Sequence, residues 1–306
     1  SGKDMDIRVS TAPGVFGESI VMRLLPKNRD SLSLAGLGFE PDHLKMLRQW
    51  LAFPNGIVLV TGPTGSGKST TLYAALEEMR DGSNKIITVE DPVEYQVSGV
   101  TQIQAHAEIG YTFARALRAI LRQDPDVIMV GEVRDLDTAQ IAIQSALTGH
   151  LVLSTLHTND AASAFTRLVD MGLEPFLVAA SVRGVQAQRL VRKLCEHCAE
   201  VEVEPELPAA WYEMGRRAVD GVWMSARGCV HCHQTGYRGR MGIYELVPLS
   251  GPLQKLVNNQ APLQEIKALI KSQGYRGLLE DGLVKASKGL TSIEEVMRVA
   301  YVEQDD

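Results

Sequence analysis

Residues 62–69 read Gly62-Pro63-Thr64-Gly65-Ser66-Gly67-Lys68-Ser69, and this stretch decides how the rest of the chain is interpreted. It fits the pattern G-x-x-x-x-G-K-[ST], between an apolar run and a helix-forming run, which is the context in which that pattern binds phosphate. Glycines let the backbone wrap closely around phosphates, and the helix that follows directs its positive end at the anion. Lys68 is expected to contact the β- and γ-phosphates, Ser69 to bind Mg²⁺, and Thr70 to complete the site. A glycine-rich turn that only opens a helix is the weaker alternative.

Strands and helices alternate on both sides of this motif. Apolar strands are predicted at residues 57–60, 85–89, 127–130 and 150–154, and helices at residues 41–50, 68–79, 112–122, 137–147 and 161–171. Such alternation predicts an α/β fold, a RecA-like P-loop core whose mainly parallel sheet is covered by helices on both faces. The nucleotide is then expected beyond the carboxyl ends of the strands.

Carboxylates and a histidine follow three of these strands. Glu132 comes just after residues 127–130, Glu90, Asp91 and Glu94 follow residues 85–89, and His157 follows residues 150–154. These side chains are expected to meet at one edge of the sheet and to form a Mg-nucleotide pocket. Glu132 or Glu90 is the candidate general base, and His157 a phosphate sensor. In isolation, a solvated loop acid or a structural histidine is a plausible alternative, but placement at the ends of core strands favours the functional interpretation.

The composition excludes some classes of protein. The 306 residues are 45% hydrophobic and 22% charged, with a net charge of -6 and only 6% aromatic residues. That balance gives a globular core but neither the basic surface nor the stacking side chains of a nucleic-acid binder. No apolar stretch approaches the roughly 18 residues of a spanning helix. Residues 1–4 show no signal peptide and no Met, so the chain is expected to be an engineered, cytosolic fragment that begins within a domain.

The remaining segments suggest five parts. Residues 6–9 and 19–24 alternate and flank turn residues, which predicts a pair of strands. Residues 263–270 and 292–300 have helical periodicity. The expected parts are terminal strands of a truncated N-terminal domain at 1–27, a linker at 28–40, the ATPase core at 41–192, a tetracysteine module at 193–242 and a C-terminal helical region at 243–306.

All four cysteines fall in two C-x-x-C pairs, Cys195 with Cys198 and Cys229 with Cys232, separated by 30 residues. Two such turns supply four thiolates for a tetrahedral ion, and the absence of an open position predicts structural Zn²⁺. Disulfides are the weaker explanation for a cytosolic chain. Residues 191–242 contain seven basic and seven acidic residues, so the module has no nucleic-acid footprint.

These motifs together resemble the ATPase family of type II secretion and type IV pilus assembly. Residues 87–95 resemble its Asp box, residues 130–135 its atypical Walker B motif, and residues 154–159 its His box. The resemblance covers nearly the whole chain. The metal module resembles that of secretion and pilus-extension members, whereas pilus-retraction members lack it. Residues 137–142 and 171–177 resemble the secretion members slightly more.

The resemblance implies a cytoplasmic, homohexameric motor that uses ATP, Mg²⁺ and structural Zn²⁺. It implies that Arg8 and Arg23 act as arginine fingers, although either residue, taken alone, reads as a solvated strand residue. It implies contact with inner-membrane secretion platform proteins, with the membrane reached only through those partners and with no direct nucleic acid. The expected function is to power pseudopilus assembly and protein export in type II secretion. Type IV pilus extension is the alternative within the family, and a zinc-ribbon nucleic-acid motor or a non-hydrolysing scaffold are alternatives outside it.

Overall fold

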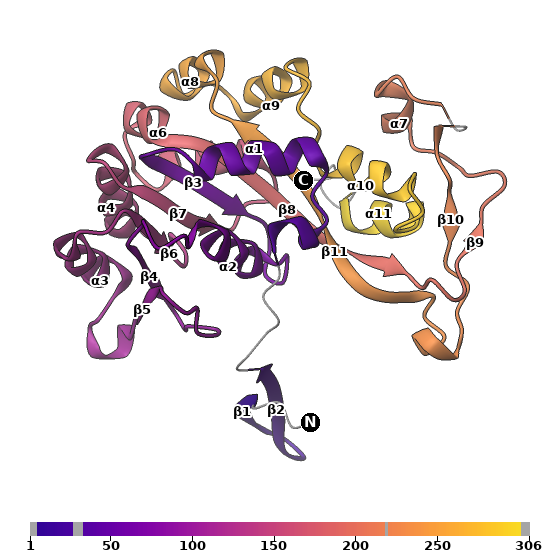
Figure 1. Cartoon of the computed structure of the whole chain (residues 1–306), viewed down its shortest axis with the longest axis horizontal. Helices are drawn as coiled ribbons and strands as arrows, with labels where there is room; N and C mark the ends of the chain where they lie inside the picture. The colour runs from indigo at the N-terminus through magenta and orange to yellow at the C-terminus, as the bar shows by residue number, and fades with distance from the viewer. Residues whose placement is uncertain (1–4, 27–32, 218–219, 301–306) are drawn as a thin grey trace.

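A computed structural model describes residues 5–26, 33–217 and 220–300 of the chain. Its centre is a seven-stranded sheet with the order β11-β8-β3-β7-β6-β4-β5 (Figure 1). Every neighbouring pair in this sheet is parallel except β11 with β8. The predicted α/β fold with a mainly parallel sheet is therefore confirmed.

The strands and helices have the following bounds. The strands are β1 (Met5–Gly14), β2 (Gly17–Pro26), β3 (Gly56–Thr61), β4 (Ile86–Glu90), β5 (Thr101–Gln104), β6 (Val127–Val130), β7 (Leu151–Leu156), β8 (Val182–Leu194), β9 (Glu200–Val201), β10 (Met224–Ser225) and β11 (Tyr237–Pro248). The α-helices are α1 (Pro41–Leu51), α2 (Lys68–Met79), α3 (Phe113–Ile120), α4 (Leu136–Leu147), α5 (Ala161–Asp170), α6 (Pro175–Ser181), α7 (Ala209–Glu213), α8 (Gly251–Asn258), α9 (Leu263–Ser272), α10 (Leu278–Ala286) and α11 (Ile293–Ala300).

Two apolar cores lie on opposite faces of the sheet. Alternate residues of a strand belong to different cores. In β3, Ile57 and Leu59 lie in the core on one face, and Val58 and Val60 lie in the core on the other. Helices α3 to α6, with α8 and α9, pack on the first face, and α1 and α2 pack on the second. Because both faces are covered, β3, β4, β6 and β7 consist of buried residues throughout, as expected for central parallel strands.

The predicted strands and helices of the core are present with small shifts at their ends. The structure adds elements that the sequence pattern does not predict, among them β8 and β11, which form one end of the sheet. Residues 33–40, the described part of the segment predicted as a linker, also differ from that prediction. Leu34 is fully buried, Phe39 stacks on Tyr244 at 3.7 Å between ring centroids, and residues Leu34–Leu37 form a 3-10 helix. This part of the segment is therefore packed against the core.

The tetracysteine region leaves the sheet at the end of β8 and returns to it through β11. Figure 1 shows α7, β9 and β10 extending away from the main sheet. Trp211 and Trp223 of this region meet edge to face at 4.9 Å and pack with Leu283 and Val296 of α10 and α11. The module is thus an insertion between two adjacent strands, and the C-terminal helices pack on it.

Strands β1 and β2 form the predicted hairpin, which stands apart from the rest of the fold in Figure 1. None of the helices in the described ranges combines the length and the apolar content needed to cross a membrane.

Candidate functional site

The phosphate motif forms the loop between β3 and α2. Gly62, Gly65 and Gly67 have φ values of 145°, 82° and 90°, which are conformations that residues with a Cβ rarely adopt. The Ser66 N–H donates to the Pro63 carbonyl at 3.2 Å, and Gly67 is the N-cap of α2. The loop therefore has the tight backbone that phosphate binding requires, at the positive end of a 12-residue helix.

Lys68 lies over this loop. Its ammonium donates to the carbonyl oxygens of Gly62 at 2.6 Å and Pro63 at 3.1 Å, and the residue is 9% exposed. Burial lowers the pKa of Lys68 below its ordinary value, and the negative charge of Glu132 opposes that shift. A buried ammonium that shares a loop with a helix N-terminus is a binding group for an anion.

The sheet order brings the predicted strand-end residues next to the loop. Strands β3, β7, β6 and β4 are adjacent in that order, so the segments after them share one edge of the sheet. The Thr61 hydroxyl accepts from the Thr158 N–H at 2.9 Å, which ties the phosphate loop to the segment after β7. The Thr155 hydroxyl donates to the Gly131 carbonyl at 2.7 Å, which ties β7 to the segment after β6. Three loops are therefore held together through hydroxyl groups.

Glu132 and His157 meet at this edge. The Nε2 atom of His157 lies 3.3 Å from a carboxylate oxygen of Glu132, and the other oxygen of Glu132 is paired with Arg134. The Glu132 side chain is 12% exposed, whereas those of His157 and Arg134 are 48% and 64% exposed. The Glu132 carboxylate is therefore largely shielded from water, whereas its two partners are exposed to it.

Glu90 has a different environment from Glu132. It is 4% exposed, and its carboxylate accepts hydrogen bonds from the Tyr73 and Thr88 hydroxyls and from the Gln102 side-chain amide. Burial, and after it the Glu90 carboxylate, raise the pKa of Tyr73 well above its usual range. The Tyr73 hydroxyl also accepts from the Glu94 N–H at 3.2 Å, so this network fixes the backbone after β4.

The other predicted site residues are distributed as follows. Ser69 and Thr70 are partly buried in the first turn of α2, while the side chains of Asp91 and Glu94 are exposed. Arg8 and Arg23 are paired across the β1–β2 ladder, and their side chains lie outside the described part of the structure.

Gln188 of β8 is a contact of the phosphate loop that the sequence does not reveal. Its side-chain amide donates to the Ser66 carbonyl at 2.7 Å and accepts from the Thr71 hydroxyl at 2.9 Å. The available signal is the sequence Gln186-Ala187-Gln188, because two polar residues at alternate positions beside apolar neighbours are unusual in a buried strand.

The four cysteines converge on one point. Their sulfur atoms all lie within 4.8 Å of one another, with separations of 3.9 Å for Cys195 and Cys229 and 3.8 Å for Cys198 and Cys232. Four thiolates about 2.3 Å from a tetrahedral zinc ion are separated by about 3.8 Å. The Cys229 and Gly236 N–H groups donate to the Cys232 sulfur at 3.1 and 3.2 Å, as suits a thiolate. The cluster could therefore hold a metal ion of this kind.

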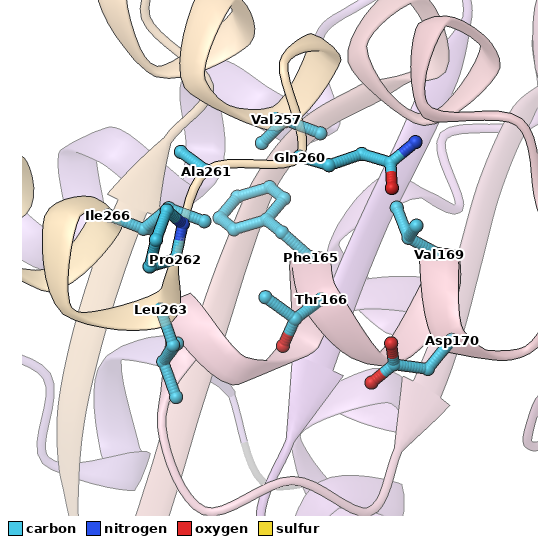
Figure 2. Close-up of a pocket in the computed structure, with 10 residues that line it drawn as sticks. All are labelled: Phe165, Thr166, Val169, Asp170, Val257, Gln260, Ala261, Pro262, Leu263 and Ile266. Atoms are coloured by element: carbon cyan, nitrogen blue, oxygen red, sulfur yellow. The ribbon is translucent and has the colours of Figure 1, made fainter.

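A separate cavity of about 260 Å³ lies between α5 and the α8–α9 connection (Figure 2). Phe165, Val257 and Ile266 are its buried apolar residues, and Thr166 and Asp170 are polar residues at the cavity. None of the residues that line it belongs to the phosphate motif. The cavity is therefore distinct from the strand-edge site.

The chain matches the family model described as "Type II/IV secretion system protein" over residues 1–298. It is 53% identical to type II secretion system protein HxcR of Pseudomonas aeruginosa, with 98% of this chain and 60% of that protein covered. It is 50% identical to type II secretion system ATPase E of Vibrio cholerae, with 97% and 59% covered. The type IV pilus assembly ATPase PilB of Thermus thermophilus is 48% identical, with 96% and 33% covered. The chain therefore spans about 60% of the first two relatives.

Among solved structures, the fold is similar to that of the pilus retraction motor PilT, which was solved with bound ADP. The TM-score is 0.68 at 28% identity, with 95% of this chain and 73% of that chain covered. The likeness of fold extends over nearly the whole chain.

Proposed function

The chain belongs to the type II/IV secretion system protein family, and from that membership and its strand-edge geometry we propose that it hydrolyses ATP to drive type II secretion. The observation that carries this proposal is the placement of Glu132 and His157 at one edge of the sheet, beside the phosphate motif that contains Lys68. A binding site for a nucleotide needs only the loop. Hydrolysis also needs a general base, and a partly desolvated carboxylate beside the loop supplies one.

The proposed roles follow from these positions. The loop residues Gly62 to Ser69, with Thr70, hold the phosphates, and Lys68 turns from the Gly62 and Pro63 carbonyls to the bound anion. Mg²⁺, when bound, neutralises charge on the phosphates, and the Ser69 hydroxyl is its candidate protein ligand. Glu132 accepts the proton of the attacking water, and His157 orients Glu132 and senses the phosphate.

The carboxylates after β4 support the pocket. Glu90, at the end of β4, accepts a hydrogen bond from Tyr73 of α2. This bond fixes the position of α2 relative to the end of β4. Asp91 and Glu94 are exposed after this strand and are candidates for outer contacts with the metal's water shell. Glu90 remains the alternative general base.

Larger features of the proposal come from the family. We infer a homohexamer in which Arg8 and Arg23 of the hairpin complete the site as arginine fingers, which stabilise charge in the transition state. We also infer a cytoplasmic motor that reaches the inner membrane through secretion platform proteins and assembles a pseudopilus. Structural Zn²⁺ in the tetracysteine cluster completes the set of cofactors.

Assembly of a type IV pilus is a second candidate, because the pilus assembly ATPase PilB is nearly as similar as the secretion relatives. A pull-down with the inner-membrane platform proteins of each system separates the two candidates. Capture by the secretion platform alone supports the proposal, and capture by the pilus platform alone contradicts it.

Measuring ATP hydrolysis with and without DNA tests the class of motor. The net charge of -6 and the balanced charge of residues 191–242 lead us to expect a rate that DNA does not change. Strong stimulation by DNA would instead identify a nucleic-acid motor.

A further inference from the structure

Gln188 is a buried amide that contacts the phosphate loop from a neighbouring strand. Gln188 is 1% exposed, and its Nε2 atom donates to the Ser66 carbonyl at 2.7 Å. Its Oε1 atom accepts from the Thr71 hydroxyl at 2.9 Å and from the Gln186 amide at 2.8 Å. Both ends of the amide are therefore engaged, one with the loop and the other with α2 and β8.

The chemistry of its partners fixes the orientation of this amide. A carbonyl oxygen only accepts hydrogen bonds, so the NH₂ group of Gln188 must face Ser66. The amide oxygen must then face Thr71, whose N–H in turn donates to the Gly67 carbonyl at 3.0 Å in the first turn of α2. Gln188 thus ties the loop and the start of the helix to the same strand.

The hydrogen bond to Ser66 also orients a neighbouring N–H group. The Ser66 carbonyl and the Gly67 N–H belong to one peptide group, and in a trans peptide they point in opposite directions. Because Gln188 draws the Ser66 carbonyl toward β8, the Gly67 N–H is directed away from β8. Motifs of this kind bind phosphate through N–H groups of the loop backbone, so the orientation of this peptide bears on phosphate binding.

The glycines of the loop are packed closely on β8. A Cβ atom added to Gly62 would lie 2.5 Å from the backbone carbonyl oxygen of Gln188. A Cβ added to Gly67 would lie 3.3 Å from the Gln188 amide nitrogen. The glycines of the motif therefore serve close approach to Gln188 as well as to phosphate.

We propose that Gln188 is a positioning residue for nucleotide binding, which holds the Ser66–Gly67 peptide so that its N–H faces the phosphates. The proposal rests on the proposed ATP-binding function. An apolar side chain of similar length would fill the same space, but it would leave the Ser66 carbonyl without its donor and the peptide free to rotate.

The substitution Gln188→Met tests this role through two measurements, the affinity for Mg·ADP by calorimetry and the steady-state kcat and KM for ATP. Affinity for Mg·ADP is expected to fall about 10-fold, the effect of one well-placed hydrogen bond. The loop contacts phosphate in the ground state and the transition state alike, so KM should rise while kcat stays nearly constant. Gln188→Glu keeps the size of the side chain but places an acceptor against the Ser66 carbonyl, so its loss of affinity should be larger.

Thr291→Val is the matched control, because Thr291 is 0% exposed and its hydroxyl donates to another backbone carbonyl, that of Arg192 in β8, at 2.8 Å. It should lower the melting temperature of the nucleotide-free protein about as much as Gln188→Met, while Mg·ADP affinity stays within about two-fold of wild type. Equal losses of affinity in Thr291→Val and Gln188→Met would overturn the positioning role, as would wild-type affinity in folded Gln188→Glu. Wild-type protein that fails to bind Mg·ADP would overturn the proposed function as well.

Discussion

Glu90 is the last residue of β4 and Glu132 follows the neighbouring β6. The surroundings of the two carboxylates suit different tasks. Glu90 is enclosed by the hydroxyls of Tyr73 and Thr88 and by the Gln102 amide. The two partners of Glu132, His157 and Arg134, are themselves exposed to solvent. A general base must release its partners to accept a proton from water, so we expect Glu132 to be the base and Glu90 to hold the pocket wall.

The substitution Tyr73→Phe tests the structural role of Glu90. The substitution removes the hydroxyl that donates to the carboxylate of Glu90, a residue that is 4% exposed. It also removes the acceptor of the Glu94 N–H. A buried acceptor that loses its donor costs about 1–3 kcal/mol, so the free energy of unfolding in urea should fall by that amount. Tyr212→Phe is the control, since Tyr212 is 53% exposed and should change stability by less than about 0.5 kcal/mol. Equal stability of the Tyr73→Phe variant and wild type would show that Glu90 does not depend on this bond.

At the scale of single elements, β8 shows where sequence reasoning succeeds and where it stops. Most strands and helices from α1 to α5 have clear apolar periods and could be predicted with small shifts at their ends. The exception is β5, a strand of four residues that are exposed or partly buried and that show no such period. Strand β8 has buried glutamines and partly buried arginines, and tertiary contacts pair Gln188 with the loop and Arg192 with Glu295. No local pattern encodes such partners. Motif spacing predicted the phosphate loop, the strand-end acids and the cysteines, whereas Gln188 required the fold.

The structural Zn²⁺ proposed for the tetracysteine cluster predicts that the stability of this module depends on the metal. Wild-type protein purified in reductant should contain one zinc per chain by elemental analysis, and Cys232→Ser should contain much less. Because metal-binding energy is folding energy, the variant should expose residues 195–232 to protease before the core unfolds. Val230→Ser is the control, since Val230 lies between two cysteines but is 76% exposed. Wild-type protein that folds fully with less than one zinc per chain would argue against a structural metal.

At the scale of the whole molecule, a buried set of charges joins α1, β11 and α10. Asp281 is 0% exposed and pairs with Lys285, which is 1% exposed, while its other oxygen lies 3.4 Å from Nδ1 of His43. The Tyr244 N–H donates to Asp281 at 2.9 Å, and Arg276 is paired with Asp42 of α1. Burial lowers the pKa of Lys285 and of His43, and in each case Asp281 opposes the shift. Helix α1 and strand β11 are thus connected to α10 through the carboxylate of Asp281.

Replacing that carboxylate should therefore destabilise the whole fold. Asp281→Asn leaves Lys285 buried without its counter-charge, which should lower the free energy of unfolding by about 3–5 kcal/mol. The double variant Asp281→Asn with Lys285→Met removes the stranded charge and should recover part of that loss. Glu78→Gln breaks the exposed pair with Arg48 and should cost less than about 1 kcal/mol. Denaturant unfolding of the four proteins measures these differences, and an Asp281→Asn variant no weaker than Glu78→Gln would contradict the role of this network.

The strand edge that carries Lys68, Glu132 and His157 is the proposed ATP-hydrolysing site, and one comparison tests it directly. ATP hydrolysis and Mg·ATP binding are measured side by side for the wild-type protein and for Glu132→Gln. The substitution keeps the size of the side chain and removes the base, so turnover should fall by at least about 100-fold while affinity for Mg·ATP is retained. A Glu132→Gln variant that binds Mg·ATP and hydrolyses it at the wild-type rate would contradict a catalytic role for this edge of the sheet.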